Sequence, residues 1–156
     1  MCARRESLLQ DLPLERPEDD HARDKEMSDA VWSPIEATAI ALTAQLQPGS
    51  SPDTVNVVIK IEHADISLQR QDDCWAGRLD VLFAERDDHG GLYDNVSTKI
   101  DLRLKSAGYQ NLMRDDLSYR RILKSDARAN VLRIVVRDAA SGSIGSVTVP
   151  LGNLAR

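Results

Sequence analysis

The sequence predicts an all-β protein in which two antiparallel sheets pack face to face, preceded by a short helix. From residue 38 to residue 151, hydrophobic residues alternate with polar ones in successive short runs, the pattern of strands with one buried face. The runs recur every roughly 8–15 residues and are mostly separated by turn residues, which is typical of antiparallel sandwiches. Only one short segment among them has helical spacing, whereas a parallel sheet needs a helix between its strands.

The chain has 156 residues, of which 42% are hydrophobic and 29% are charged, and its formal net charge is −5. This length suits one domain, and the hydrophobic share is enough to form a core. The balance of charge is mildly acidic and no block is rich in lysine or arginine, so we expect no nucleic-acid partner. No apolar run approaches the ~20 residues that a helical membrane span needs, so we expect no span.

The amino terminus carries no visible export signal. Leu8 and Leu9 are followed at once by Gln10 and Asp11, whereas a signal peptide needs an apolar core of about 7–15 residues. These residues therefore leave the localisation of the protein open.

Residues 1–33 are predicted to form a flexible tail and a short helix over 17–31. Pro17 suits the first helical turn, and the acidic residues 18–20 favour the positive end of the helix dipole. Pro34 ends the helix, because the residue before a proline is pushed out of helical geometry.

Residues 35–47 fit two patterns. Their apolar residues fall near helical spacing, whereas those from residue 38 onward also alternate with period two. The dense turn cluster at 47–53 and the alternating run at 55–61 that follows are typical of a hairpin. We therefore predict a strand over 38–47 rather than a helix.

Alternating runs predict six further strands, at 66–68, 75–83, 96–104, 117–124, 132–136 and 147–151. Apolar residues at i, i+3, i+4 spacing predict one inserted helix over 106–115. Residues 34–156 thus predict one sandwich of the immunoglobulin-like or fibronectin-III-like kind. Its aromatic core anchors are expected to be Trp32, Trp75, Phe83 and Tyr119.

The turn at 87–91 has the residue types of a metal-binding loop. It offers hard oxygen ligands around two glycines, from Asp87, Asp88 and Asp94, beside His89. The spacing does not match an EF-hand loop, which needs acceptors at alternate positions and a closing glutamate about 12 residues on. Aspartate and glycine are also what a hairpin turn requires, so we interpret the segment as a solvated turn without a metal.

The sequence offers no catalytic constellation. Three histidines lie far apart and none has metal-ligand spacing: His21, His63 and His89. The two cysteines are too few for a disulfide framework, and both are expected to be unpaired thiols: Cys2 and Cys74. Three serines lie in or beside a glycine turn without a nucleophile elbow: Ser141, Ser143 and Ser146. We therefore predict no catalytic, cofactor-binding or metal-binding residue, and no enzyme.

Basic residues gather in the C-terminal third, at Arg114, Arg120, Arg121, Lys124, Arg128, Arg133 and Arg137. They fit either a basic face for an acidic partner or ordinary solvent-facing strand positions. We favour the second interpretation, because surfaces of mixed sign are the norm and Arg133 and Arg137 alternate with core positions. The acidic run at 18–26 is a candidate to pack against this face.

Three stretches carry a resemblance to a known family: AVWSPIEAT at 30–38, WAGRLD at 75–80 and RDAASGSIGS at 137–146. In their order and spacing, the chain from about residue 30 to 151 resembles the C-terminal β-rich region of bacterial von Willebrand factor A-related proteins. The resemblance implies the accessory sandwich alone, because the Asp-x-Ser-x-Ser adhesion motif of the upstream A-type domain does not occur in this sequence. The resemblance also implies that the protein is exported, which conflicts with the missing export signal. A truncated or fragmentary reading frame would explain that conflict.

We therefore expect a non-catalytic structural or protein-interaction module, an accessory domain that contacts a protein partner or an adjacent domain through loops or an exposed strand edge. The alternative is a carbohydrate- or ligand-binding sandwich, which an exposed aromatic platform would indicate. Aromatic residues make up only 4% of the chain, which argues against that alternative.

Overall fold

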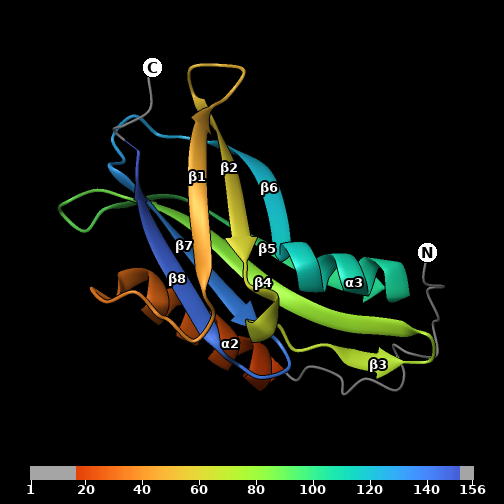
Figure 1. Cartoon of the computed structure of the whole chain (residues 1–156). Coiled ribbons are helices and arrows are strands. Elements are labelled where there is room, and N and C mark those ends of the chain that lie inside the picture. Colours follow the sequence, from red (N-terminus) through yellow and green to blue (C-terminus); the bar gives the residue numbers. More distant parts are fainter. Residues whose placement is uncertain (1–16, 152–156) are drawn as a thin grey trace.

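The computed structural model describes residues 17–151, which form two antiparallel sheets and two α-helices (Figure 1). Every strand pairing among these residues is antiparallel, which confirms the all-β prediction. Neither described helix has the length and apolarity that a bilayer crossing requires. The tail predicted before residue 17 lies outside the described residues.

The smaller sheet has three strands in the order β1-β2-β6. β1 (Leu42–Pro48) and β2 (Thr54–Ile61) form the predicted hairpin, and β6 (Leu117–Lys124) pairs with the other edge of β2. In β2, side chains alternate between buried and less buried positions along the whole strand, because only one face of this sheet contacts the interior.

The larger sheet is built around the long strand β4 (Cys74–Arg86). β5 (Leu92–Leu104) pairs with one edge of β4, while β3 (Gln69–Gln71) and β7 (Val131–Asp138) pair with the other. β8 (Ile144–Pro150) completes the sheet beside β7. The long β4–β5 hairpin and the β7–β8 hairpin therefore supply most of this layer.

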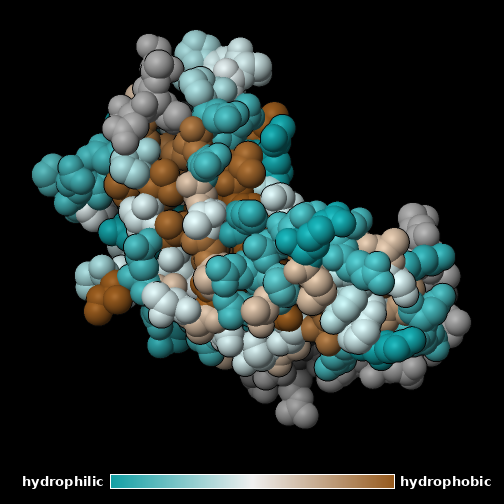
Figure 2. Space-filling view, in the orientation of Figure 1, coloured by the Kyte–Doolittle hydropathy of each residue, from teal (hydrophilic) through white to brown (hydrophobic). Residues whose placement is uncertain are grey.

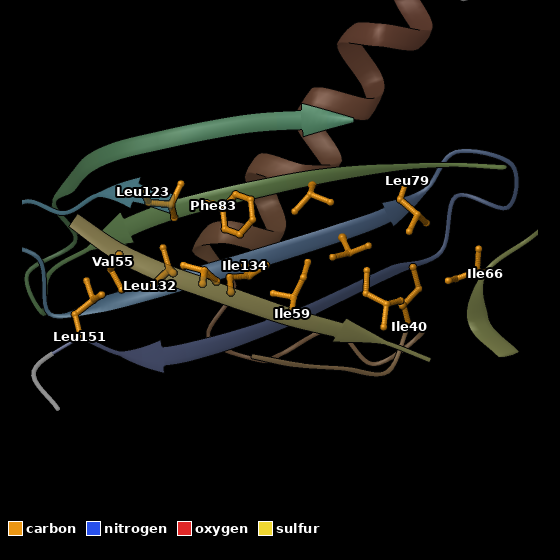
Figure 3. Close-up of a cluster of buried hydrophobic side chains, with 14 of the residues drawn as sticks. Ile40, Val55, Ile59, Ile66, Leu79, Phe83, Leu123, Leu132, Ile134 and Leu151 are labelled. Carbon is orange, nitrogen blue, oxygen red and sulfur yellow. The ribbon is translucent and has the colours of Figure 1, made fainter. Parts of the chain in front are cut away.

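The main core lies between the two sheets (Figure 3). Val57 and Ile59 of β2 face Phe83 of β4 and Ile134 of β7, all at most 2% exposed. At about 25 cal/mol per Å² of apolar surface removed from water, a filled layer of this kind is the main stabilising contribution to such a fold. This is the interior that the period-two alternation predicts.

Helix α2 (Pro17–Trp32) covers the opposite face of the larger sheet. Its buried residues Met27 and Val31 pack on Ala84 of β4 and Val135 of β7. The described part of the protein therefore has three layers, with α2 on one side of the larger sheet and the smaller sheet on the other (Figure 1). The helix boundaries agree with the predicted range 17–31 to within one residue.

Helix α3 (Ser106–Asp115) matches the predicted inserted helix and connects β5 to β6, so that the chain passes from one sheet to the other. The ring of Tyr109 stacks on Trp75 at the start of β4, with 4.3 Å between the ring centroids. This aromatic contact fixes α3 against the end of the larger sheet.

Several predicted strands differ in extent from the observed ones, and two of the differences have a clear structural cause. The strand expected over 38–47 begins at Leu42, because residues before it pair with β8 instead, through Thr38 opposite Gly145. The strand expected over 66–68 is not formed. A 3-10 turn, η1 (His63–Asp65), precedes this segment, and the amide of Ser67 donates to the Asp138 carboxylate rather than to a sheet neighbour.

The expected aromatic anchors have different environments. Phe83 is in the core, and Tyr119 and Trp75 are partly buried. Trp32 is 42% exposed, so the expectation that it anchors the core is wrong. The guanidinium of Arg86 lies 5.2 Å from the centre of its ring, a cation–π contact at the surface that is compatible with this exposure.

Candidate interaction surface

The turn that resembles a metal loop is held by its own hydrogen bonds. The Asp87 Oδ1 atom accepts from the amides of His89 at 2.8 Å and Gly91 at 2.7 Å, and Tyr93 donates its hydroxyl to the other oxygen. These donors, Tyr93 first, lower the pKa of Asp87 below its ordinary value. Asp88 accepts from the Asn130 side chain at 2.6 Å. The two acids therefore stabilise the turn and the loop beside it.

No group of three or more histidine, cysteine or acidic side chains in the described region is arranged to hold a metal ion. Cys74 is disulfide-bonded, so the expectation of an unpaired thiol is wrong at this position, while Cys2 lies outside the described residues. Ser141 accepts from the amide of Ser143 at 3.2 Å, and Ser146 accepts from the amide of Ala37 at 2.8 Å. Both hydroxyls thus support local backbone geometry.

Glu85 is a buried acid at the end of β4. It is 3% exposed, and its Oε2 atom accepts from the amide of Asp126 at 3.1 Å. Burial raises the pKa of Glu85 above its ordinary value, although the hydrogen bonds from Asp126 and Ser125 act in the opposite direction. The carboxyl group therefore anchors the loop between β6 and β7 at a cost in desolvation.

We expect Glu85→Gln to stabilise the protein at pH 7. A raised native pKa means that the folded state holds the proton more tightly than the unfolded state. The contribution of Glu85 to the free energy of unfolding therefore falls as pH rises from the ordinary pKa of glutamate through the raised native pKa. Glutamine keeps an acceptor oxygen and removes the buried charge. The expected gain is about 1 kcal/mol or less at pH 7, shrinking toward zero near pH 4. Urea unfolding at both pH values measures it, with exposed Glu62→Gln as the control; a variant less stable than wild type at pH 7 would contradict it.

One hydrogen-bonded pair was not visible in the sequence, because its partners are 53 positions apart. The Nδ1 atom of His63 in η1 lies 2.6 Å from Oδ1 of Asp116, which also accepts from the His63 amide at 3.1 Å. The two bonds from His63, the amide first, lower the pKa of Asp116. Asp116 has a φ of +63°, a strained value for a residue with a side chain. The pair joins the chain after β2 to the junction of α3 and β6.

The basic residues of the C-terminal third do not form one face. Four of them are engaged by neighbours: Arg114 with Asp115, Arg128 with Asp126, Arg137 with Glu26, and Arg133 with main-chain carbonyls. Glu26 belongs to the acidic run 18–26, so the interpretation that this run packs against basic residues is confirmed at its 3.2 Å contact with Arg137. The expectation of a solvent-facing position is wrong for Arg133, which is 3% exposed because α2 covers it.

The three remaining basic residues all lie on β6. Arg120 and Lys124 point to the outer face of the smaller sheet and are exposed, whereas Arg121 points to the inner face and is partly buried. Arg121 donates to the hydroxyl of Tyr119 at 3.4 Å, while its Nε atom is buried and has no hydrogen-bond partner in the described part of the chain. β6 therefore presents cations on both faces of its sheet.

We call the outer surface of the smaller sheet the β6 face. Its side chains are Thr43, Gln45, Gln47, Thr54, Asn56, Val58, Lys60, Ser118, Arg120, Ile122 and Lys124. None of these side chains is acidic, although the whole chain is net negative. Ile122 is 63% exposed and lies opposite Asn56, between Arg120 and Lys124 along the strand. In Figure 2, hydrophobic side chains are visible among hydrophilic ones over the region of β1 and β2.

Comparison with known proteins does not identify a family for this chain. No family model matches the chain, and no curated protein matches it. A solved structure, described as a hypothetical protein PH1083 from Pyrococcus horikoshii OT3, is similar over 71% of this chain and 87% of its own, with 10% sequence identity and a TM-score of 0.41. A likeness of this size carries no argument about function.

Proposed function

We propose that this chain is a non-catalytic protein-interaction module that binds an acidic protein partner through the β6 face. On the sequence resemblance, we assign it to the accessory domains of von Willebrand factor A-related proteins, with a sandwich of the immunoglobulin-like or fibronectin-III-like kind. The antiparallel sheets support this assignment, as does the placement of the motif RDAASGSIGS across the turn between β7 and β8.

The observation that carries the proposal is the composition of the β6 face. Ile122, on the edge strand of this face, is a large apolar side chain left 63% exposed, so its apolar surface is available to a partner. Arg120 and Lys124 flank it along β6 with positive charge that no carboxylate of the same face offsets. A partner with an apolar residue flanked by acidic ones is complementary to this arrangement.

A peptide-display selection with the full chain as bait tests the proposal. We expect wild-type protein to enrich peptides that combine aspartate or glutamate with aliphatic residues. The double variant Arg120→Glu with Lys124→Glu reverses the charge beside Ile122 and should lose this enrichment. The matched control, Lys99→Glu with Arg103→Glu on β5, makes the same change of charge on the larger sheet and should keep it. Equal enrichment by both double variants, or none by wild type, would contradict the proposal.

A further inference from the structure

The outer edge of β6 offers unpaired main-chain groups. The amide of Ser125 donates to the carbonyl of Asp53 at 2.7 Å, just beyond the ends of β6 and β2. This bond shows which of the opposite residue pairs in β2 and β6 are hydrogen-bonded. In an antiparallel pair, hydrogen-bonded positions alternate with non-bonded ones. Pairs such as Val57 with Arg121 are therefore the bonded ones, and the N–H and C=O groups of alternate residues point away from β2: Ser118, Arg120, Ile122 and Lys124.

No strand among residues 17–151 pairs with this edge of β6. The residues that present free main-chain groups are the same ones whose side chains form the β6 face, namely Arg120, Ile122 and Lys124 with Ser118. A free edge of this kind is a template for an added strand. Side-chain and main-chain recognition would therefore act together on one extended segment.

The charge on β6 selects the kind of strand that this edge accepts. A second copy of β6 placed alongside would bring Arg120, Arg121 and Lys124 against the same three cations, and like charges on neighbouring strands are destabilising. Acidic side chains would instead meet Arg120 and Lys124 on the outer face and the buried Nε of Arg121 on the inner face. The free edge of β1 bears no charged side chain at all, so it offers no such selection.

We propose that an acidic, extended segment of a partner protein adds to the outer edge of β6 as a fourth strand of the smaller sheet. This inference rests on the proposed function and specifies its binding mode: the segment pairs antiparallel or parallel with β6 through the outward main-chain groups of Arg120 and Ile122. Its alternate side chains cover Ile122 and neutralise the basic residues of the strand.

Two variants at one position separate main-chain from side-chain recognition. Arg120→Thr and Arg120→Pro remove the same charge, but only proline also removes the outward N–H group. Proline is tolerated in an edge strand where the N–H faces solvent, so the pairing of β6 with β2 is expected to persist. The probe is a fluorescein-labelled nine-residue peptide of alternating glutamate and valine, and its binding to the full chain is followed by fluorescence anisotropy.

We expect Arg120→Pro to bind this peptide about tenfold more weakly than Arg120→Thr. Proline removes one interstrand hydrogen bond and disturbs the pairing of the residues beside it. In wild-type protein, the amides of Arg120 and Ile122 should become protected from hydrogen exchange on peptide addition, while those of Ala44 and Leu46 at the β1 edge should not. This exchange measurement does not depend on the folding of the proline variant.

The outcomes distinguish the two proposals. Equal peptide affinity for Arg120→Pro and Arg120→Thr, without protection of the Arg120 and Ile122 amides, would overturn strand addition. If display selection still depends on Arg120 and Lys124 in that case, the β6 face binds its partner by side chains alone and the proposed function stands. Protection at Ala44 and Leu46 instead would place the added strand at β1 and would also overturn the inference.

Discussion

Replacing Arg133 by methionine is expected to destabilise the protein by about 3 kcal/mol or more and to loosen α2 from the larger sheet. The guanidinium of Arg133 donates to the carbonyls of Ala30 at 3.2 Å, Ser33 at 3.0 Å and Ile35 at 2.9 Å, and to the Thr148 hydroxyl at 2.6 Å. Methionine can follow the aliphatic part of the side chain, but it donates no hydrogen bond. Carbonyl groups at the end of α2 and just after it would lose their donor in a partly buried site.

Urea unfolding of the variant measures the loss of stability, and hydrogen exchange of the α2 amides measures the detachment of the helix. Arg128→Met is the matched control, because Arg128 is exposed and forms its ion pair with Asp126 at the surface, where such pairs contribute little to stability. An Arg133→Met variant within about 1 kcal/mol of wild type, with unchanged exchange in α2, would show that the hydrogen bonds of Arg133 do not hold the helix in place.

Much of the fold could be predicted from the sequence, because alternation of apolar and polar residues specifies strands directly. The predicted ranges 106–115 and 117–124 coincide with α3 and β6, and 55–61 differs from β2 by one residue. Alternation was less informative at 66–68, where two apolar residues around Ser67 suggest a strand. Ile66 does enter the core, but Asp138 takes the Ser67 amide, a contact with a residue 71 positions away that no local pattern reveals.

The charged residues were harder to interpret, because a strand pattern identifies two faces but not what covers each of them. Arg133 and Arg120 both occupy the face of a strand opposite its core side chains. The first is buried by α2 at the surface of the larger sheet, and the second remains exposed on the smaller sheet, which has no covering helix in the described region. Arg137 is removed from the set of candidate site residues by a contact with distant Glu26, whereas Arg114 and Arg128 are removed by acidic neighbours in the sequence, Asp115 and Asp126.

The pair of His63 and Asp116 illustrates the same limit. Asp116 follows α3 and has a backbone conformation that favours glycine, so its residue type gives no local reason for its position. Its role is to accept two hydrogen bonds from His63, which lies near it only because β2 and β6 are neighbours. The turn at 87–91 was predictable for the opposite reason, since Asp87 bonds to amides within four residues of itself.

Gly145→Ala is expected to destabilise the protein by about 3 kcal/mol, in the upper part of the range for overpacked sites. A Cβ atom at Gly145 would lie 2.1 Å from the carbonyl oxygen of Ile40 and 2.7 Å from a methyl carbon of Leu42. The segment at Ile40 and the strand at Gly145 are held together by a main-chain hydrogen bond, because the amide of Ala39 donates to the carbonyl of Ile144 at 3.1 Å. The methyl group would therefore force apart β8 and the segment that leads into β1, at the crossing between the two sheets.

Thermal unfolding should show this as a decrease in Tm of about 6–12 °C for a chain of this size. Gly108→Ala is the matched control, because Gly108 lies within α3 and its added methyl group would meet a Leu104 side-chain atom at 3.4 Å. Alanine at that position should be neutral or stabilising by up to about 1 kcal/mol, as expected for glycine replaced within a helix. If Gly145→Ala unfolded at the wild-type temperature, the segment before β1 would not be packed against β8 in solution, and the link between the two sheets would lie elsewhere.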